Sequence, residues 1–269
     1  MADQAATLEK LIRDLVVPAG AVACIWLGQA GYLLKSPDGV IVMIDPYLSD
    51  WAEQQWGLRR IIDPPIDPEH LQPDLLLISH WHEDHLDAPV IKLWSKLATG
   101  IFAGPETCTV RAHAWGWPTG QVVDLPRGQL MTHQDVTVTA TFARHDTPFA
   151  PAGDEVGFLL DINGLRIWYV GDTEYDARLR PMKEESIDVA LIPINGVGGN
   201  LNADEAALLI SVVKPRVVVP MHYNMWAPED FGPDATLNPR QFAGTHAKLE
   251  GTAEVKVLAV GEIVTFSKA

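Results

Sequence analysis

The sequence predicts an α/β fold in which stacked β-sheets are covered by helices. Short apolar runs bounded by Gly, Asp, Asn and Pro recur along the whole chain, which is the pattern of strands separated by turns. Two dipeptides between such runs, Asp38-Gly39 and Asn163-Gly164, are typical of tight hairpin turns. Later in the chain, strand patterns alternate with amphipathic helix patterns. Early hairpins followed by strand–helix alternation favour a layered α/β protein.

The predicted strands are short apolar runs, rich in residues that suit a buried pleated surface. In order along the chain they are Ala21–Leu27, Tyr32–Leu34, Val40–Ile44, Leu75–Ile78, Val136–Phe142, Val156–Asp161, Leu165–Val170, Val189–Pro193, Val217–Pro220 and Val255–Val260. The run Val136–Phe142 alternates apolar residues with threonine, as expected for a strand with one buried face.

Four segments have helical patterns. Residues Ala5–Val17 form an amphipathic segment before the first strand. The segment Ala88–Leu97 follows an aspartate that can cap it, and it has a proline in its first turn. Ala203–Val213 has Ala, Leu and Ile at amphipathic spacing, and Asn202 can cap it. Pro239–Leu249 is the fourth predicted helix.

The composition is that of a globular enzyme. Of 269 residues, 47% are hydrophobic and 20% are charged, which is enough apolar material for a sizeable core. No linker, low-complexity tract or internal repeat divides the chain, so we expect residues 1–269 to form a single domain. The formal net charge of -15 repels phosphate backbones, and nucleic acid is therefore not an expected partner.

Two features bear on the compartment. Cys24 and Cys108 both lie in apolar surroundings, and we expect buried free thiols rather than a disulfide. The apolar stretch Val16–Leu27 is too short to span a bilayer and is interrupted by Pro18 and Gly20. The charged residues before it do not form the basic head of a signal peptide. We therefore expect a cytoplasmic protein without a membrane partner.

A cluster of metal-binding side chains directly follows the apolar run Leu75–Ile78. Three histidines and an aspartate lie within six consecutive positions, namely His80, His82, Asp84 and His85. Burying so many polar groups at one strand end is costly unless a partner such as a divalent cation binds them. Imidazole and carboxylate together suit zinc, manganese or iron, and the segment has no thiolate. The alternative, a solvated histidine-rich loop, does not explain this spacing.

Three further candidate ligands, His145, Asp172 and His222, each lie just past the end of a predicted strand. Sheets commonly present functional groups at such positions. Gly171 allows the backbone to turn tightly before Asp172. An aspartate at a strand end is more often a cap than a ligand, but the joint occurrence of these residues favours a site. The seven residues suffice for two metal ions, and the two oxygens of Asp172 can bridge them.

In these motifs the sequence resembles the metallo-β-lactamase superfamily of binuclear metal hydrolases. The resemblance extends from about Ile25 to the C-terminus. Its motifs occur in the order His-x-His-x-Asp-His at 80–85, His145, Gly171-Asp172-Thr173 and Pro220-Met221-His222-Tyr223. The resemblance implies the αβ/βα four-layer sandwich of that superfamily, with the site at one edge of the two sheets.

The resemblance also implies which residues hold each metal ion. One ion would be held by His80, His82 and His145. The other would be held by Asp84, His85 and His222, with Asp172 bridging the two ions. The implied cofactors are therefore two divalent metal ions, and this ligand set accepts zinc or manganese alike.

Three other segments, Trp26–Tyr32, Ile44–Asp50 and Asn195–Ala206, resemble the L-ascorbate-6-phosphate lactonase branch, which opens a sugar-acid lactone. The expected function is therefore hydrolysis of a small anionic lactone, similar to L-ascorbate 6-phosphate, by a metal-bound hydroxide. Asp84 would orient the water and shuttle its proton besides acting as a ligand. The alternative within the superfamily is a metal-dependent phosphodiesterase.

Candidate substrate contacts are Arg144, Asn195 and Asn202. A guanidinium binds phosphate or carboxylate with two hydrogen bonds, although strand alternation would point Arg144 away from its neighbour His145. The two asparagines flank a loop rich in Gly and Asn that could close over a substrate. The expected partner is a small-molecule substrate, and the resemblance suggests a homo-oligomer. A non-catalytic binding module is a third interpretation, which the complete ligand set argues against.

Overall fold

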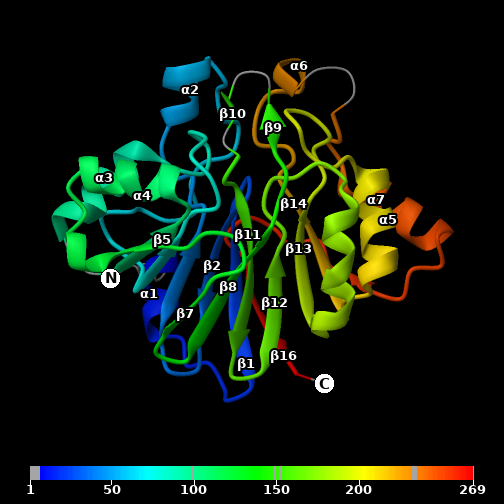
Figure 1. Cartoon of the computed structure of the whole chain (residues 1–269), viewed down its shortest axis with the longest axis horizontal. Coiled ribbons are helices and arrows are strands. Elements are labelled where there is room, and N and C mark those ends of the chain that lie inside the picture. The colour runs from blue at the N-terminus through cyan, green and yellow to red at the C-terminus, as the bar shows by residue number, and fades with distance from the viewer. Residues whose placement is uncertain (1–6, 98–99, 148–149, 152, 232–234, 269) are drawn as a thin grey trace, which may run out of the picture.

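The computed structural model describes residues 7–97, 100–147, 150–151, 153–231 and 235–268. Two seven-stranded mixed sheets stack face to face, and helices cover the outer face of each sheet (Figure 1). This arrangement confirms the α/β four-layer sandwich that the sequence predicts. A short two-stranded ribbon of β9 (Asp146–Thr147) and β10 (Ala150–Pro151) extends from one end of the sandwich.

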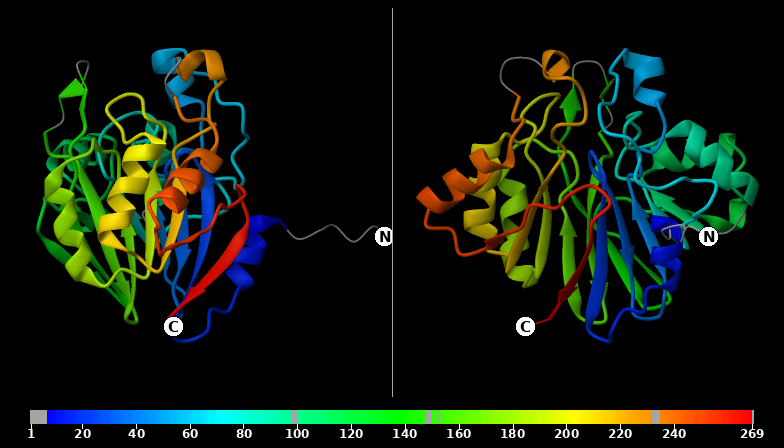
Figure 2. Two further views of the ribbon diagram at one scale, coloured as in Figure 1. Left: turned by 90° about the vertical axis from the view of Figure 1, so that its right-hand side faces the viewer. Right: turned by 180° about the vertical axis from the view of Figure 1, so that it is seen from behind.

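The first sheet joins the N-terminal strands to the last strand of the chain. In spatial order it contains β16 (Ile263–Ser267), β1 (Ala21–Gly28), β2 (Gly31–Lys35), β3 (Ile41–Ile44), β4 (Leu75–Leu77), β5 (Ile101–Gly104) and β6 (Val122–Asp124). Strands β16 to β3 pair in antiparallel fashion, and β3 to β6 pair in parallel. Figure 2 shows β16 beside β1, although they come from opposite ends of the chain.

The second sheet is built from the later strands. In spatial order it contains β15 (Glu254–Val255), β14 (Val217–Met221), β13 (Val189–Pro193), β12 (Leu165–Tyr169), β11 (Val156–Ile162), β8 (Val136–Phe142) and β7 (Leu130–His133). Strands β12, β13 and β14 are parallel, so their carboxyl ends lie at the same edge. The predicted hairpin turn between β11 and β12 is confirmed, because Asn163 and Gly164 both have positive φ, as a tight turn of this kind requires.

The helices are divided between the two sheets. On the first sheet lie α1 (Leu8–Asp14), α3 (Ala88–Leu97) and α4 (Glu106–Ala114). On the second sheet lie α5 (Ala203–Val213), α7 (Pro239–Lys248) and the 3₁₀ helix Ala177–Glu185. Two short helices, α2 (Trp51–Trp56) and α6 (Pro228–Phe231), lie together at the end of the sandwich that also carries β9 and β10 (Figure 1). A short 3₁₀ turn, Thr119–Gln121, precedes β6.

Alternation along the strands divides the core into two layers. In β1, the side chains of Cys24 and Trp26 belong to the cluster between the two sheets. Their neighbours Ile25 and Leu27 belong to the cluster beneath the helices of the first sheet, which also contains Trp94 of α3. Successive strand side chains point to opposite faces, so a wholly apolar strand can serve both layers. This explains why β1 is buried at every position.

Most predicted elements are present, with shifted ends. The predicted strand Val255–Val260 is wrong beyond its first residue, because the chain leaves the sheet edge after β15 and turns at Gly261 into β16. The predicted helix Ala5–Val17 ends at Asp14, and Val17 precedes a proline, a position that disfavours helix. Residues 5 and 6 of this prediction lie outside the described residues.

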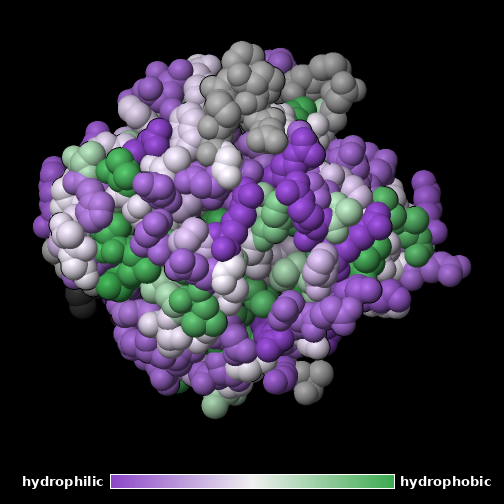
Figure 3. Space-filling view, in the orientation of Figure 1, coloured by the Kyte–Doolittle hydropathy of each residue, from purple (hydrophilic) through white to green (hydrophobic). Residues whose placement is uncertain are grey.

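Two further expectations can be compared with the structure. Cys24 and Cys108 are both buried and free, as predicted. Among the described residues, no helix is long and apolar enough to cross a membrane. On the face shown in Figure 3, hydrophobic residues appear in small groups among hydrophilic ones.

Candidate metal centre

The seven candidate ligands meet at the edge where several strands end. The cluster His80–His85 follows β4 of the first sheet, and His145 follows β8 of the second. Asp172 and His222 follow β12 and β14, whose carboxyl ends lie at one edge because the strands are parallel. All seven side chains are buried. Both sheets therefore contribute to one site.

The first group of possible ligands consists of His80, His82 and His145. The Nδ1 atom of His82 lies 2.9 Å from Nε2 of His80 and 3.1 Å from Nε2 of His145. The other ring nitrogen of His145 lies 3.0 Å from the carbonyl oxygen of Gly199, which fixes Nδ1 as the protonated nitrogen. Three ring nitrogens therefore converge, and that of His145 faces the centre without a proton.

The second group consists of Asp84, His85 and His222. Oδ2 of Asp84 lies 3.7 Å from Nε2 of His85 and 3.7 Å from Nε2 of His222. His222 has a backbone φ of 59°, in the left-handed region that non-glycine residues seldom adopt. Its backbone N–H donates to the carbonyl oxygen of Gln29 across the sandwich, which holds this unusual conformation in place.

Asp172 lies between the two groups. Its Oδ2 atom is 3.7 Å from Nε2 of His145 in the first group. The same oxygen is 3.3 Å from Nε2 of His85 and 3.1 Å from Nε2 of His222 in the second. Gly171 has a φ of 72°, and a Cβ there would lie 2.8 Å from the carbonyl oxygen of Val156. Only glycine therefore allows the chain to turn here and aim Asp172 at both groups.

Buried polar atoms that make no hydrogen bond indicate that cations fit this site. Within the described part of the chain, His85 Nε2, both ring nitrogens of His222 and Asp172 Oδ1 are buried and make no hydrogen bond. Leaving such groups unpaired costs about 1–3 kcal/mol each. Imidazole nitrogens and carboxylate oxygens are ligands of zinc and of similar divalent ions. The donor set therefore fits divalent metal ions.

The local charges suit metal binding as well. Burial lowers the pKa of His80 well below its usual value and that of His82 to about 4, so both rings are neutral at neutral pH. Burial opposes ionisation of Asp172, but His222 and His85 outweigh it and hold the pKa of this carboxyl well below its ordinary range. Neutral imidazoles and an ionised carboxylate are the forms that bind metals.

Asp45 positions His85 from behind. Its Oδ2 lies 2.9 Å from His85 Nδ1, accepts the Tyr169 hydroxyl at 2.6 Å and also accepts the Ser79 hydroxyl. Its Oδ1 accepts the backbone N–H of Ser79 at 2.7 Å. Burial lowers the pKa of His85, but Asp172, Asp84 and Asp45 outweigh it and raise that pKa well above its usual value. With Nδ1 held by Asp45, His85 presents Nε2 to the centre.

Two amide side chains hold the carboxylates of the centre. Gln29 Nε2, in the turn between β1 and β2, donates to Asp84 Oδ2 at 2.7 Å. Asn200 Nδ2 donates to Asp172 Oδ2 at 2.8 Å. Each bond orients one carboxylate while leaving its other oxygen available.

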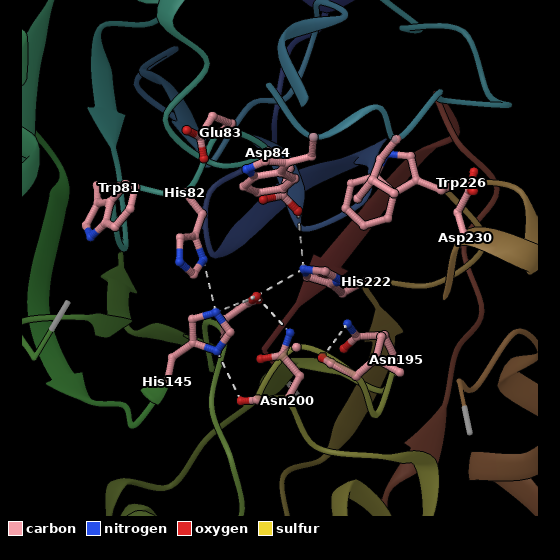
Figure 4. A pocket seen from close by; sticks show the side chains of 16 residues that line it. Trp81, His82, Glu83, Asp84, His145, Asn195, Asn200, His222, Trp226 and Asp230 are labelled. Atoms are coloured by element: carbon pink, nitrogen blue, oxygen red, sulfur yellow. Dashed lines mark hydrogen bonds and ion pairs between the residues drawn. The ribbon is translucent and has the colours of Figure 1, made fainter. Parts of the chain in front are cut away.

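A cavity of about 690 Å³ opens onto these groups. Figure 4 shows His82, His145, Asp84 and His222 converging on it. Its other lining residues come from α2, α6 and the loops between strands, and they are Trp56, Leu58, Trp81, Glu83, Asp172, Asn195, Val197, Gly198, Gly199, Asn200, Trp226 and Asp230. The cavity is large enough for a small-molecule substrate.

The three predicted substrate contacts lie in different places. Asn195 lines the cavity, and its Nδ2 donates to the carbonyl oxygen of Val197 at 3.3 Å. Arg144 is not a lining residue, and its guanidinium lies 3.7 Å from Glu174 and 3.9 Å from Asp176. Asn202 is also outside the lining, because its side chain caps α5 in a reciprocal capping box. Arg144 lies between β8 and β9, and the structure does not bring it or Asn202 to the cavity.

Comparison with known proteins identifies the family. A model of the β-lactamase superfamily domain matches residues 24–222. A UPF0173 metal-dependent hydrolase from Polynucleobacter asymbioticus is 32% identical over 226 residues, which cover 76% of this chain and 75% of the relative. The chain belongs to the metallo-β-lactamase superfamily. Within it, the chain is a member of the UPF0173 family of metal-dependent hydrolases.

Solved structures of the superfamily share this fold. Igni18, a metallo hydrolase from the archaeon Ignicoccus hospitalis, superposes with a TM-score of 0.71 at 25% identity and covers 93% of this chain and 100% of its own. The metallo-β-lactamase fold protein YhfI from Bacillus subtilis superposes with a TM-score of 0.67 at 15% identity, covering 92% of this chain and 100% of its own. The four-layer sandwich is thus the metallo-β-lactamase fold.

Sequence reasoning assigned no role to several residues that support the centre of this metallo-β-lactamase-fold protein. Asp45, Gln29 and Asn200 act through other side chains, and nothing in the local sequence marks Gln29 or Asn200 as the partner of a ligand. One signal was present for Asp45, which follows the strand Ile41–Ile44 and precedes a proline. Its φ of 43° is unusual for a non-glycine residue, and such residues often lie at functional sites.

Proposed function

We propose that this hydrolase contains a binuclear metal centre and cleaves a carboxylic ester or lactone. The observation that supports two ions rather than one is the position of Asp172, whose Oδ2 lies within 3.7 Å of ring nitrogens from both ligand groups. In this proposal His80, His82 and His145 hold one ion, and Asp84, His85 and His222 hold the other. When bound, two such ions lower the pKa of a water and polarise the carbonyl of the substrate.

The side chains of the protein orient the reaction. Asp84 is the proposed proton carrier, because it belongs to the second ligand group and also lines the cavity. Gln29 donates to Oδ2 of Asp84 and so fixes the rotation of this carboxylate. Asn200 does the same for Asp172. In the overall reaction one water adds across the acyl C–O bond, which gives a carboxylic acid and an alcohol.

Phosphodiester hydrolysis is the second candidate in the superfamily. A phosphodiester is anionic and is commonly held by arginine or lysine. None of the residues that line the cavity is arginine or lysine. The lactone suggested by the resemblance, L-ascorbate 6-phosphate, carries a phosphate and meets the same difficulty. These observations support an ester or lactone as the reacting group. They give no arginine or lysine in the cavity lining that could bind the phosphate of L-ascorbate 6-phosphate.

The test is turnover by protein reconstituted in parallel with manganese and with zinc. The substrates are a simple aryl ester, a simple lactone, L-ascorbate 6-phosphate and bis-nitrophenyl phosphate. We expect turnover of the ester or the lactone that is abolished by a chelator and reduced at least a hundredfold in Asp84→Asn. Turnover of the diester alone would contradict the proposed reaction, and near-normal rates in Asp84→Asn would remove that residue from the chemistry.

A further inference from the structure

The lining of the cavity carries no positive side chain apart from the histidines of the centre. Every lysine and arginine of the chain lies within the described ranges, because the undescribed positions contain neither residue type. None of them lines the cavity. The lining does include two further acids, Glu83 and Asp230. An anionic substrate would therefore meet negative charge beside the centre, in a protein whose formal net charge is already -15.

Arginines near the site are engaged elsewhere. The guanidinium of Arg60 stacks over the Tyr47 ring at 4.8 Å and donates to the carbonyl oxygens of Tyr47, Ser49 and Ile62. Arg111 stacks over the Trp81 ring at 4.8 Å, and its Nη1 donates to the carbonyl oxygen of Thr107. Neither arginine lines the cavity, so their guanidinium groups are not placed to bind a substrate with two parallel hydrogen bonds.

The walls themselves are aromatic and aliphatic. Three tryptophans line the cavity together with two aliphatic residues, and they are Trp56, Trp81, Trp226, Leu58 and Val197. The ring centres of Trp56 and Trp81 lie 6.1 and 5.1 Å from that of His82, each nearly perpendicular to it. Trp81 and Trp226 lie on opposite sides of the cavity in Figure 4. Apolar walls thus flank the proposed metal ligands.

Trp56 has the features of a binding residue rather than a core residue. Its side chain is 41% exposed although it is large and apolar, and it stands at the end of the short helix α2. An exposed tryptophan beside a catalytic group offers a planar apolar surface that a flat substrate can cover.

We infer that the substrate is an uncharged ester or lactone that carries an aromatic or similarly apolar group, seated against Trp56 and Trp81. The inference rests on the proposed function and names its substrate class. The lining carboxylates of Asp84, Asp172, Glu83 and Asp230 would balance the charge of two divalent ions, so the metal-loaded cavity would offer no net attraction to a cationic or an anionic substrate. An uncharged apolar molecule needs no such attraction and can pack against the tryptophan rings.

The inference can be tested with three acetate esters of matched shape. They are phenyl acetate, 4-acetoxybenzenesulfonate and 4-acetoxyphenyltrimethylammonium, which differ in charge next to the same reacting group. Each kcat/KM is divided by the rate constant of the same ester with hydroxide, which removes the difference in leaving-group reactivity. We expect the neutral ester to exceed both charged esters at least tenfold. Equal values, or a preference for the sulfonate, would overturn the inference while leaving ester hydrolysis intact.

A binding measurement tests the preference for an uncharged substrate independently of ester hydrolysis. Acetophenone and 4-acetylbenzenesulfonate present the same ketone and cannot be hydrolysed, so their affinities for the metal-free protein can be compared by ligand-observed NMR. We expect the neutral ketone to bind at least fivefold more tightly. If no ester is turned over but the neutral ketone binds preferentially, the proposed reaction fails and the preference of the cavity for an uncharged apolar molecule stands. Tighter binding of the sulfonate would overturn the class.

Variants paired with controls outside the cavity test whether Trp56 and Asp230 contact the substrate. Trp56→Ala should lower kcat/KM for phenyl acetate at least fivefold, mainly through KM, whereas Trp115→Ala, outside the cavity, should leave it unchanged. Asp230→Lys should raise the relative rate of 4-acetoxybenzenesulfonate at least threefold. The control Glu69→Lys makes the same charge change at an exposed position outside the lining and should have little effect. Equal effects of a variant and its control would contradict the assigned positions.

Discussion

Replacing Asp45 with asparagine is expected to weaken the binding of one metal ion selectively. In the native protein Asp45 Oδ2 accepts hydrogen bonds from Ser79, Tyr169 and His85 and is fully buried. Its bond to His85 Nδ1 orients the ring so that Nε2 faces Asp84 and Asp172, where it can bind a metal ion in place of a proton. Asparagine keeps the shape of this side chain, but its amide N–H₂ cannot accept a hydrogen bond.

The magnitude follows from the two responses open to His85. If His85 keeps the proton on Nδ1, two donors face each other in a buried site, which costs about 1–3 kcal/mol. If the proton moves to Nε2, that nitrogen can no longer bind a metal. A cost of about 1.4 kcal/mol corresponds to a factor of ten in affinity. We therefore expect the ion held by Asp84, His85 and His222 to bind about 10–100-fold more weakly, as is typical when a partner of a metal-bound histidine is removed.

The assay is metal content after dialysis against a competing chelator of known affinity, measured by inductively coupled plasma mass spectrometry. At intermediate chelator concentration the wild type should retain two ions per chain and Asp45→Asn one. Tyr169→Phe is the control, because it removes the 2.6 Å bond to the same carboxylate but leaves the bond to His85. It should retain both ions. The reasoning is refuted if a folded Asp45→Asn variant, checked by circular dichroism, binds both ions with wild-type affinity.

Three further predictions concern the turn, the thiols and the metal. Gly171→Ala should lower activity at least tenfold and destabilise the protein, because the backbone φ of Gly171 is 72° and the new Cβ would contact Val156. A turnover assay measures the first effect and thermal unfolding the second. Burial raises the pKa of the Cys24 and Cys108 thiols. A colorimetric disulfide reagent should therefore label them only when the protein unfolds. Rapid labelling of the native protein would contradict this prediction. Metal at 100 times its Kd should stabilise the metal-free protein by about 2.7 kcal/mol. This corresponds to roughly 5–10 °C in Tm, and an unchanged Tm would argue against binding.

The sequence predicted the site best where the signal is local. The four ligands His80, His82, Asp84 and His85 are adjacent, and their spacing alone suggests a metal centre. The remaining ligands follow apolar runs that are recognisable as strands, and parallel strands bring their carboxyl ends to a single edge. Strand identity and ligand type together were therefore enough to assemble the set of seven.

The supporting residues could not be predicted in this way, because their contacts join distant parts of the chain. Asp45 meets Tyr169 across 124 positions, and Gln29 meets Asp84 across 55. Neither pairing leaves a periodic or local pattern in the sequence. Arg144 stays a prediction as a substrate contact: it is adjacent to His145 along the chain, but its guanidinium lies near Glu174 and Asp176.

Some elements also lack a pattern that propensity can detect. Helix α4, Glu106–Ala114, has few apolar residues, and only one side of it packs on the first sheet through Cys108 and Ala112. Helix α2, which supplies Trp56 to the cavity, has six residues and is too short to show helical periodicity. Tertiary packing rather than local preference determines such elements, so the wall of the cavity became visible only in the structure.

The central claim is that seven side chains hold two divalent ions at the shared edge of the two sheets. The most direct measurement is anomalous diffraction from crystals of the protein grown with zinc or manganese. We predict two peaks, one among His80, His82 and His145 and the other among Asp84, His85 and His222, with Asp172 in contact with both. A single peak, or ions bound only outside these residues, would contradict the account.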